Sequence, residues 1–163
     1  MATWIFWRKR WTSEDCVNSL SDGGAHCGTI CDAAATTFML QHWVRDRQGK
    51  RIPLEQAIKR QCRDTARLYG FEDRGVLAPG LLADLNVIDF EALQLELPTV
   101  AFDLPAGGRR LLQEAVGYDF TIKSGRVTFQ KGLPTGDYPG RVIRGPQPAP
   151  SVTSPPVSAT DSR

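Results

Sequence analysis

The clearest pattern along the chain is a pair of segments whose apolar residues recur at helical spacing. The first is expected to begin at Asp32, which can cap a helix, and to run to about Arg47. The second is expected to begin at Pro53 and to end before Gly70, because proline suits the first turn and glycine the left-handed cap. The pattern therefore predicts two consecutive helices.

Each predicted helix has one apolar face. On the first helix the apolar positions are Met39, Leu40, Trp43 and Val44. On the second helix we expect a buried face made of Leu54, Ala57, Ile58, Cys62, Thr65, Ala66 and Tyr69. Its solvent face is expected to carry Glu55, Gln56, Lys59, Arg60, Arg63, Asp64 and Arg67.

After Gly80 the pattern changes from helical to alternating. Residues 84–90 predict a strand, and residues 118–123 and 126–130 predict a hairpin around Ser124-Gly125. Residues 111–115 fit either a short helical turn or a strand. Near the start, the apolar stretch 17–20 predicts the end of a strand, and from Gly145 onward a chain of Pro, Ser, Thr and Ala predicts disorder.

Composition narrows the classes of protein that fit this pattern. With 163 residues and 41% hydrophobic content, the chain is long enough for one ordinary domain. A net charge of +2 gives no support for binding nucleic acid or an anionic membrane. No apolar run is long enough to span a bilayer, and the aromatic-basic start does not have the order of an export signal, so a cytoplasmic chain is expected. We interpret residues 1–16 as a segment that is not native to the fold, in preference to a membrane-surface anchor.

The four cysteines are Cys16, Cys27, Cys31 and Cys62. Without an export signal we expect free thiols. Cys27 and Cys31 lie close to His26, which is a spacing that invites a zinc interpretation. A structural zinc site normally needs four ligands in paired short spacings, so the pattern favours thiols over such a site.

One loop places a carboxylate and an imidazole on a glycine-rich turn: Ser21-Asp22-Gly23-Gly24-Ala25-His26. Aspartate before two glycines is a common turn pattern, so the loop alone fits either a plain turn or an active-site turn. A second segment, Asp73-Arg74-Gly75-Val76-Leu77-Ala78-Pro79-Gly80-Leu81-Leu82-Ala83-Asp84-Leu85, combines tight-turn residues with entry into a strand. It carries no chemistry of its own, although Asp84 can anchor a loop.

In this order and at this separation, the two segments resemble the C-terminal end of a metal-dependent amidohydrolase, most closely the D-aminoacylase (N-acyl-D-amino-acid deacylase) branch. Residues 122–127 look like the terminal hairpin of that family, and the helix with His42-Trp43-Val44-Arg45-Asp46 points to the branch. The resemblance covers roughly residues 17 to 145. It implies an α/β fold: the last strand-helix unit of a (β/α)₈ TIM-like barrel, followed by strands of a small β-sandwich domain.

This resemblance also implies a domain division. Residues 1–16 would be a non-family segment, 17–72 the end of the barrel, 73–145 part of the sandwich and 146–163 a disordered tail. Such a piece would expose apolar faces meant for neighbouring elements, so we expect self-association or a complementing barrel chain.

By the same resemblance Asp22 is the catalytic residue, acting as general base on a metal-bound water. Gly23, Gly24 and His26 are candidates for the substrate pocket, and Asp22 is the candidate metal contact. The family uses zinc or a similar divalent metal, held mostly by histidines that include a His-x-His pair. This chain has two histidines and no such pair. We therefore expect no tightly bound metal and no activity from the chain alone. His42 is expected to pack beside Trp43.

Alternatives remain open. A dihydroorotase-like or urease-like amidohydrolase shares the return into the sandwich, whereas the Gly-Gly-Ala-His continuation favours the deacylase and an N-acyl amino acid substrate. The chain could instead be a non-catalytic interaction module, or one half of a split enzyme.

Overall fold

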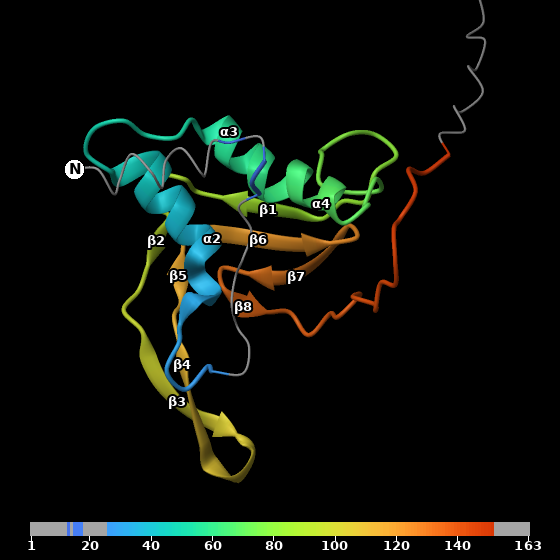
Figure 1. Cartoon of the computed structure of the whole chain (residues 1–163). Coiled ribbons are helices and arrows are strands. Elements are labelled where there is room, and N and C mark those ends of the chain that lie inside the picture. Colours follow the sequence, from blue (N-terminus) through green and yellow to red (C-terminus); the bar gives the residue numbers. More distant parts are fainter. Residues whose placement is uncertain (1–12, 14, 18–25, 152–163) are drawn as a thin grey trace, which may run out of the picture.

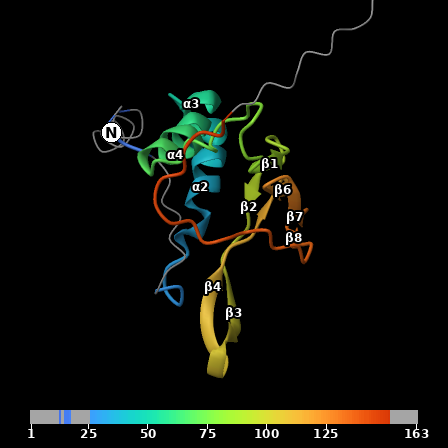
Figure 2. The same cartoon turned by 90° about the vertical axis from the view of Figure 1, so that its right-hand side faces the viewer.

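The computed structural model describes residues 13, 15–17 and 26–151. Within these residues the helices form one layer and the strands another, and a two-stranded hairpin projects beyond both (Figures 1 and 2). The expected strand at 17–20 lies largely outside the described residues, so the barrel unit stays a prediction.

The first predicted helix is present as three continuous helical segments. A 3₁₀ turn η1 (Asp32–Ala34) leads into α2 (Ala35–Phe38), which continues as the π-helical segment η2 (Met39–Asp46). The predicted cap is wrong, because Asp32 is the first helical residue and the cap position is Cys31, without a side-chain cap bond. The predicted apolar face is confirmed: Met39, Leu40, Trp43 and Val44 are all buried.

The second predicted helix consists of α3 (Leu54–Lys59), the π-helical segment η3 (Arg60–Asp64) and α4 (Thr65–Leu68). Pro53 is the residue just before the helix, and Gly70 has the expected left-handed conformation, with φ of 71°. The π-helical segment is explained locally, since the Thr65 hydroxyl donates to the Arg60 carbonyl at 2.9 Å and competes with regular backbone bonding.

The predicted burial of this second helix is partly wrong. Ala57 and Ala66 are buried as expected, but Ile58 and Tyr69 are exposed. Arg60, expected on the solvent face, is only 6% exposed. Its guanidinium donates to the carbonyl of Cys16 at 2.9 Å, so burial is accompanied by a hydrogen bond. Of Ile58, Arg60 and Tyr69, only Tyr69 follows the wider π-helical turn, which shifts later residues relative to the 3.6-residue period.

All strand pairs among the described residues are antiparallel. A four-stranded sheet has the order β1 (Leu85–Ile88), β6 (Tyr118–Lys123), β7 (Arg126–Gln130) and β8 (Leu133–Pro134). Two ribbons accompany it: β2 (Gln94–Leu95) with β5 (Ala115–Val116), and β3 (Thr99–Leu104) with β4 (Gly108–Leu112). A short 3₁₀ turn η4 (Pro105–Gly107) closes the second ribbon. The sandwich therefore stays a prediction, since one sheet and two ribbons are what the described strands form.

The predicted hairpin is confirmed with both strands at the expected residues. Ser124 and Gly125 both have positive φ, 53° and 80°, as a two-residue turn of the primed type requires. Of residues 111–115, whose pattern fits either a helical turn or a strand, Leu111 and Leu112 end β4 and Ala115 begins β5, so the strand alternative is confirmed for most of them.

The core lies between the first helix and the strands. Its buried members are Met39, Leu40, Trp43, Val44, Ile52, Ala57 and Leu93, with Ile88, Phe90 and Tyr118 packed against them. Leu93 has no exposed surface. The backbone comes unusually close at Gly117, where an added Cβ would lie 2.7 Å from the Cα of Leu93. A glycine at this position is therefore what lets β5 turn into β6 over Leu93.

The prediction of disorder from Gly145 onward is wrong for the first residues of this tail. The N–H of Gln147 donates to the Gly70 carbonyl and its own carbonyl accepts from Glu72, both at 2.8 Å. This parallel bridge returns the chain from β8 to the end of α4 (Figure 1). Residues 152–163 lie outside the described part of the chain.

Candidate functional site

The loop that carries the candidate catalytic residue is described only from His26 onward. Asp22, Gly23 and Gly24 lie outside the described residues, so their assigned roles stay predictions. His26 is exposed, and its carbonyl accepts from Thr29 and Ile30 at 2.9 and 2.8 Å. The structure thus places His26 at the start of a turn over residues 26–29, ahead of the first helix, which begins at Asp32.

The residue after His26 is fixed to the projecting ribbon. The carbonyl of Cys27 accepts a hydrogen bond from the N–H of Leu111 in β4 at 2.7 Å. Earlier in the sequence, before residues 18–25, the carbonyl of Cys16 accepts a hydrogen bond from the guanidinium of Arg60. Neither contact is predicted by the sequence patterns, because each joins residues more than forty positions apart.

The helix that follows the loop is joined to the β region by side chains as well as by the core. The Thr37 and Tyr118 hydroxyls lie 2.7 Å apart, and Gln41 accepts from the backbone of Leu95 at 3.0 Å. Arg45 donates to the Phe90 carbonyl at 2.6 Å. These contacts hold the helix across the ends of the β strands.

His42 belongs to this helix and packs as expected. Its ring stacks on Phe38 at 5.1 Å between centroids and meets Trp43 edge-on at 5.4 Å. An aromatic packing role for His42 is therefore confirmed.

The second sequence segment forms a network of charges that connects to the hairpin. Asp84 accepts from the ammonium of Lys123 at 2.9 Å and from the backbone N–H of Ser124 at 2.9 Å. Arg74 bonds Asp73 with both ends of its guanidinium, at 2.8 and 3.0 Å, and lies 3.4 Å from Asp84. The prediction that Asp84 anchors a loop is confirmed, and the loop is the turn between β6 and β7.

The charges in this network set the acidity of its carboxyls. Burial alone would raise the pKa of Asp84, but the bonds from Lys123 and Ser124 outweigh it and hold this pKa below its usual range. The bond from Arg74 likewise lowers the pKa of Asp73. Both groups are therefore ionised at neutral pH and serve structure, since every bond they make lies within the network.

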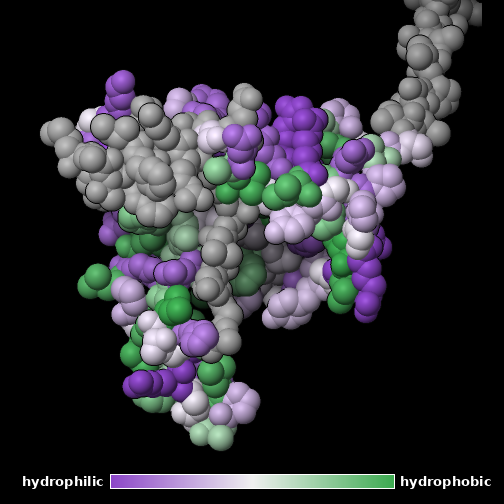
Figure 3. Space-filling model, in the orientation of Figure 1, coloured by the Kyte–Doolittle hydropathy of each residue, from purple (hydrophilic) through white to green (hydrophobic). Residues whose placement is uncertain are grey.

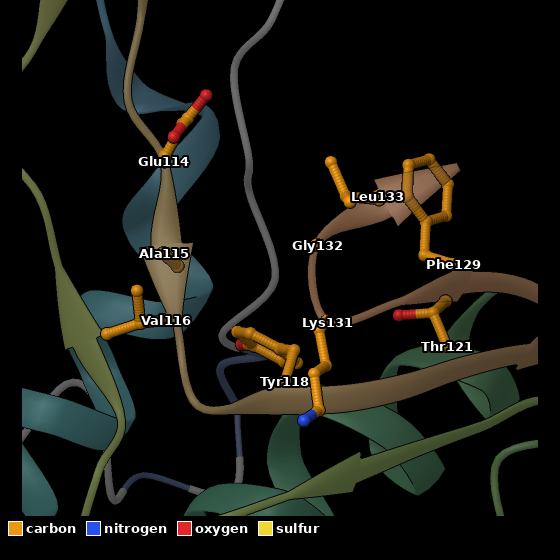
Figure 4. A pocket seen from close by; sticks show the side chains of 9 residues that line it. All are labelled: Glu114, Ala115, Val116, Tyr118, Thr121, Phe129, Lys131, Gly132 and Leu133. Atoms are coloured by element: carbon orange, nitrogen blue, oxygen red, sulfur yellow. The ribbon is translucent and has the colours of Figure 1, made fainter. Parts of the chain in front are cut away.

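A hollow of about 480 Å³ opens beside the sheet (Figure 4). The described residues that line it are Glu114, Ala115, Val116, Tyr118, Thr121, Phe129, Lys131, Gly132 and Leu133. Sequence reasoning missed this feature, because its walls come from four strands, of which the short β5 and β8 were not predicted. Lys131 and Gly132 form the two-residue turn of this second hairpin, but lysine is not a usual residue at the first turn position, so the sequence carries no clear signal for it.

The described residues do not fit a metal centre. They contain no group of three or more His, Cys, Asp or Glu side chains that could hold a metal ion.

Free thiols were expected, and Cys16, Cys27, Cys31 and Cys62 are all unpaired in the structure. No helix in the described part of the chain is long and apolar enough to cross a membrane.

Comparison with known proteins gives the class to which the chain belongs. The model of the family described as Amidohydrolase family matches residues 6–129, which include the Asp22 loop, both helices and the hairpin. The chain therefore belongs to the amidohydrolase family, whose members hydrolyse carbon–nitrogen bonds and typically bind divalent metals.

Among individual proteins, the chain is similar to a dihydroorotase from Lactobacillus gasseri, at 28% identity over 90 residues. This stretch is 53% of the chain and 20% of the dihydroorotase, so the chain spans about a fifth of that relative's length. No solved structure matches the chain significantly.

Proposed function

We propose that this chain is the C-terminal part of an amidohydrolase that cleaves the amide bond of N-acyl-D-amino acids. The observation that carries the proposal is the family match over residues 6–129. This single match contains both the Asp22 loop and the return segment at residues 73–85. The deacylase branch is supported by the Asp-Gly-Gly-Ala-His sequence of the loop. In the structure the helix that follows this loop in the sequence is bonded to the strand region through Arg45.

In this proposal the Asp22 carboxylate is the general base. It accepts a proton from the attacking water, whose oxygen bonds to the amide carbonyl carbon. The C–N bond then breaks, and the proton passes from Asp22 to the leaving nitrogen, giving a carboxylic acid and a free amine. No step is assigned to a metal, because the described residues do not supply its ligands.

The test is reconstitution with a polypeptide that carries the histidine-bearing barrel of an amidohydrolase. We expect the full chain alone to leave N-acetyl-D-methionine intact and the combined chains to hydrolyse it. Asp22→Asn should lower kcat about 10²- to 10⁴-fold with little change in KM, as expected for loss of a general base. Asp32→Asn, an exposed aspartate in the adjoining helix, is the matched control and should retain full activity.

Equal activity of Asp22→Asn and Asp32→Asn would reject Asp22 as the base. Hydrolysis by the chain alone, together with stoichiometric zinc, would reject the proposed dependence on a complementing chain.

A second candidate is hydrolysis of a cyclic amide, and the similarity to a dihydroorotase favours it. The same reconstituted sample should then open dihydroorotate faster than it cleaves N-acetyl-D-methionine. The ratio of kcat/KM values for the two substrates decides between the candidates, because it measures differential stabilisation of the two transition states.

A further inference from the structure

We propose that the hollow bounded by β5, β6, β7 and β8 binds a small apolar carboxylate, with the ammonium of Lys131 pairing with the carboxylate. This inference goes beyond the proposed hydrolysis. It concerns a different group of residues, and its test needs no catalytic activity.

The size and walls of the hollow fit a small organic molecule. Its volume of about 480 Å³ falls within the usual range for ligand pockets, about 300 to 1,000 Å³. Val116 in β5, Phe129 in β7 and Leu133 in β8 supply apolar walls, and each keeps much of its surface exposed at 47%, 41% and 71%. A ligand with a hydrocarbon body would cover this apolar surface, which is the main source of binding free energy in such sites.

Lys131 occupies a conformation that lysine rarely adopts. Its φ is 49°, and Gly132 follows with φ of 78°, so both central residues of the β7–β8 turn are left-handed. Asparagine, aspartate or glycine usually fill the first of these positions. A long cationic side chain held there at some cost in strain is an outlier of the kind found at functional sites. The backbone N–H of Lys131 donates to Asp119 at 2.9 Å, which fixes the turn on β6.

The charge at this end of the hollow is available to a ligand. Among the described residues, no ion pair includes Lys131. The nearby polar groups are already engaged: the Tyr118 hydroxyl bonds with Thr37 at 2.7 Å and the Thr121 hydroxyl with Asn86 at 2.9 Å. Figure 4 shows Lys131 reaching down beside Tyr118.

Glu114 narrows the class of ligand. Figure 4 places its carboxylate at the end of the β5 wall away from Lys131. A second negative charge on the ligand would meet Glu114 unfavourably, so a monocarboxylate fits better than a dicarboxylate. Two sources share this chemistry, namely free carboxylic acids and N-acyl amino acids.

The experiment titrates the full chain, labelled with ¹⁵N and ¹³C, with octanoate, N-octanoylglycine and the neutral control octan-1-ol. We expect saturable chemical-shift changes at Val116, Phe129 and Leu133 with at least one of the two carboxylates. Lys131→Met, which keeps a similar hydrocarbon length without the charge, should weaken carboxylate binding at least about tenfold. Lys131→Arg should restore most of it. Lys50→Met, an exposed lysine outside the hollow, is the matched control and should bind like the unaltered chain.

Each result of these titrations either supports or overturns the proposal. Tighter binding of N-octanoylglycine would assign the hollow to N-acyl amino acids, and tighter binding of octanoate would assign it to free acids; both support the proposal. It is overturned if neither carboxylate shifts the hollow residues, if octan-1-ol binds as tightly as octanoate, or if Lys131→Met binds unchanged. Because these readouts measure binding alone, they remain decisive if reconstituted hydrolysis fails.

Discussion

At the scale of single residues, Gly117 shows how one missing side chain permits the turn into the central strand. Its φ is 93°, and a Cβ at this position would meet Leu93 at 2.7 Å and the Asp89 carbonyl at 3.0 Å. Leu93 is fully buried, so it has no open space into which to move. The position thus combines backbone strain with a packed neighbour.

We predict that Gly117→Ala lowers the free energy of unfolding by at least about 2 kcal/mol, since it adds overpacking to an unfavourable φ. Gly125→Ala is the matched control, because Gly125 also has positive φ, at 80°, yet an added Cβ there would meet nothing within 4 Å. That control should lose only about 1 kcal/mol. Urea denaturation of both variants measures the difference. Equal losses would show that the close contact between the added Cβ and Leu93 does not lower the free energy of unfolding.

A second prediction at this scale concerns Asp84 and acid. The pKa of Asp84 in the folded chain lies below its unfolded value, so its contribution to stability is present at neutral pH and is lost as the pH falls below about 4 through the folded pKa. Unfolding measured by urea between pH 7 and pH 3 should show this decline, and Asp84→Asn should be less stable at pH 7 and decline less steeply. Asp73 has a lowered pKa as well, so some pH dependence should remain.

The control for this prediction is Asp103→Asn. Asp103 pairs with Arg110 in the exposed ribbon, where both side chains are well solvated, and exposed pairs contribute little to stability. A pH profile for Asp84→Asn that coincides with that of the unaltered chain would contradict the anchoring role of Asp84.

At the scale of elements, local sequence patterns predict some helices and strands of this fold and miss others. The hairpin around Ser124-Gly125 is predictable to the residue, because its turn chemistry and its alternation both lie within thirteen positions. The first helix is also predictable, including its buried face. The second helix can be found, but its π-helical turn arises from Thr65 bonding to Arg60, which no periodicity reveals. Periodicity also misses distant contacts such as the bond from Arg60 to the Cys16 carbonyl, so it assigns the buried face partly to the wrong residues.

The candidate site is less predictable than the fold, for a related reason. The short strands β2, β5 and β8 have only two residues each, which is too few for a pattern, and yet β5 and β8 form walls of the hollow. The contacts from Arg60 to Cys16 and from Leu111 to Cys27 join distant segments. Chemical motifs such as the Asp22 loop can be recognised in a sequence, whereas the neighbours that give them geometry come from tertiary packing.

At the scale of the whole molecule, the described residues leave much apolar surface uncovered. Leu68 and Tyr69 at the end of the second helix are each 64% exposed, and Phe102 on the projecting ribbon is 70% exposed. Figure 3 shows apolar residues recurring over the helices, the ribbon and the edge of the sheet. Single exposed apolar residues are ordinary, but a ribbon that projects from the body with Val100, Phe102 and Leu104 all exposed has little core of its own.

We predict that the full chain associates with itself as its concentration rises, because association is the simplest way to remove this apolar surface from water. Sedimentation velocity at chain concentrations between micromolar and hundreds of micromolar should show a growing oligomer fraction.

Phe102→Ser combined with Val100→Ser tests the ribbon, and Leu68→Ser combined with Tyr69→Ser tests the helix. The pair that restores a monomer identifies the contacting surface. If a barrel chain is the natural partner of the helix face, adding it should dissolve the oligomers that depend on Leu68 and Tyr69 and leave those that depend on Phe102. A chain that stays monomeric at every concentration and melts in one sharp transition would show instead that the exposed residues need no cover.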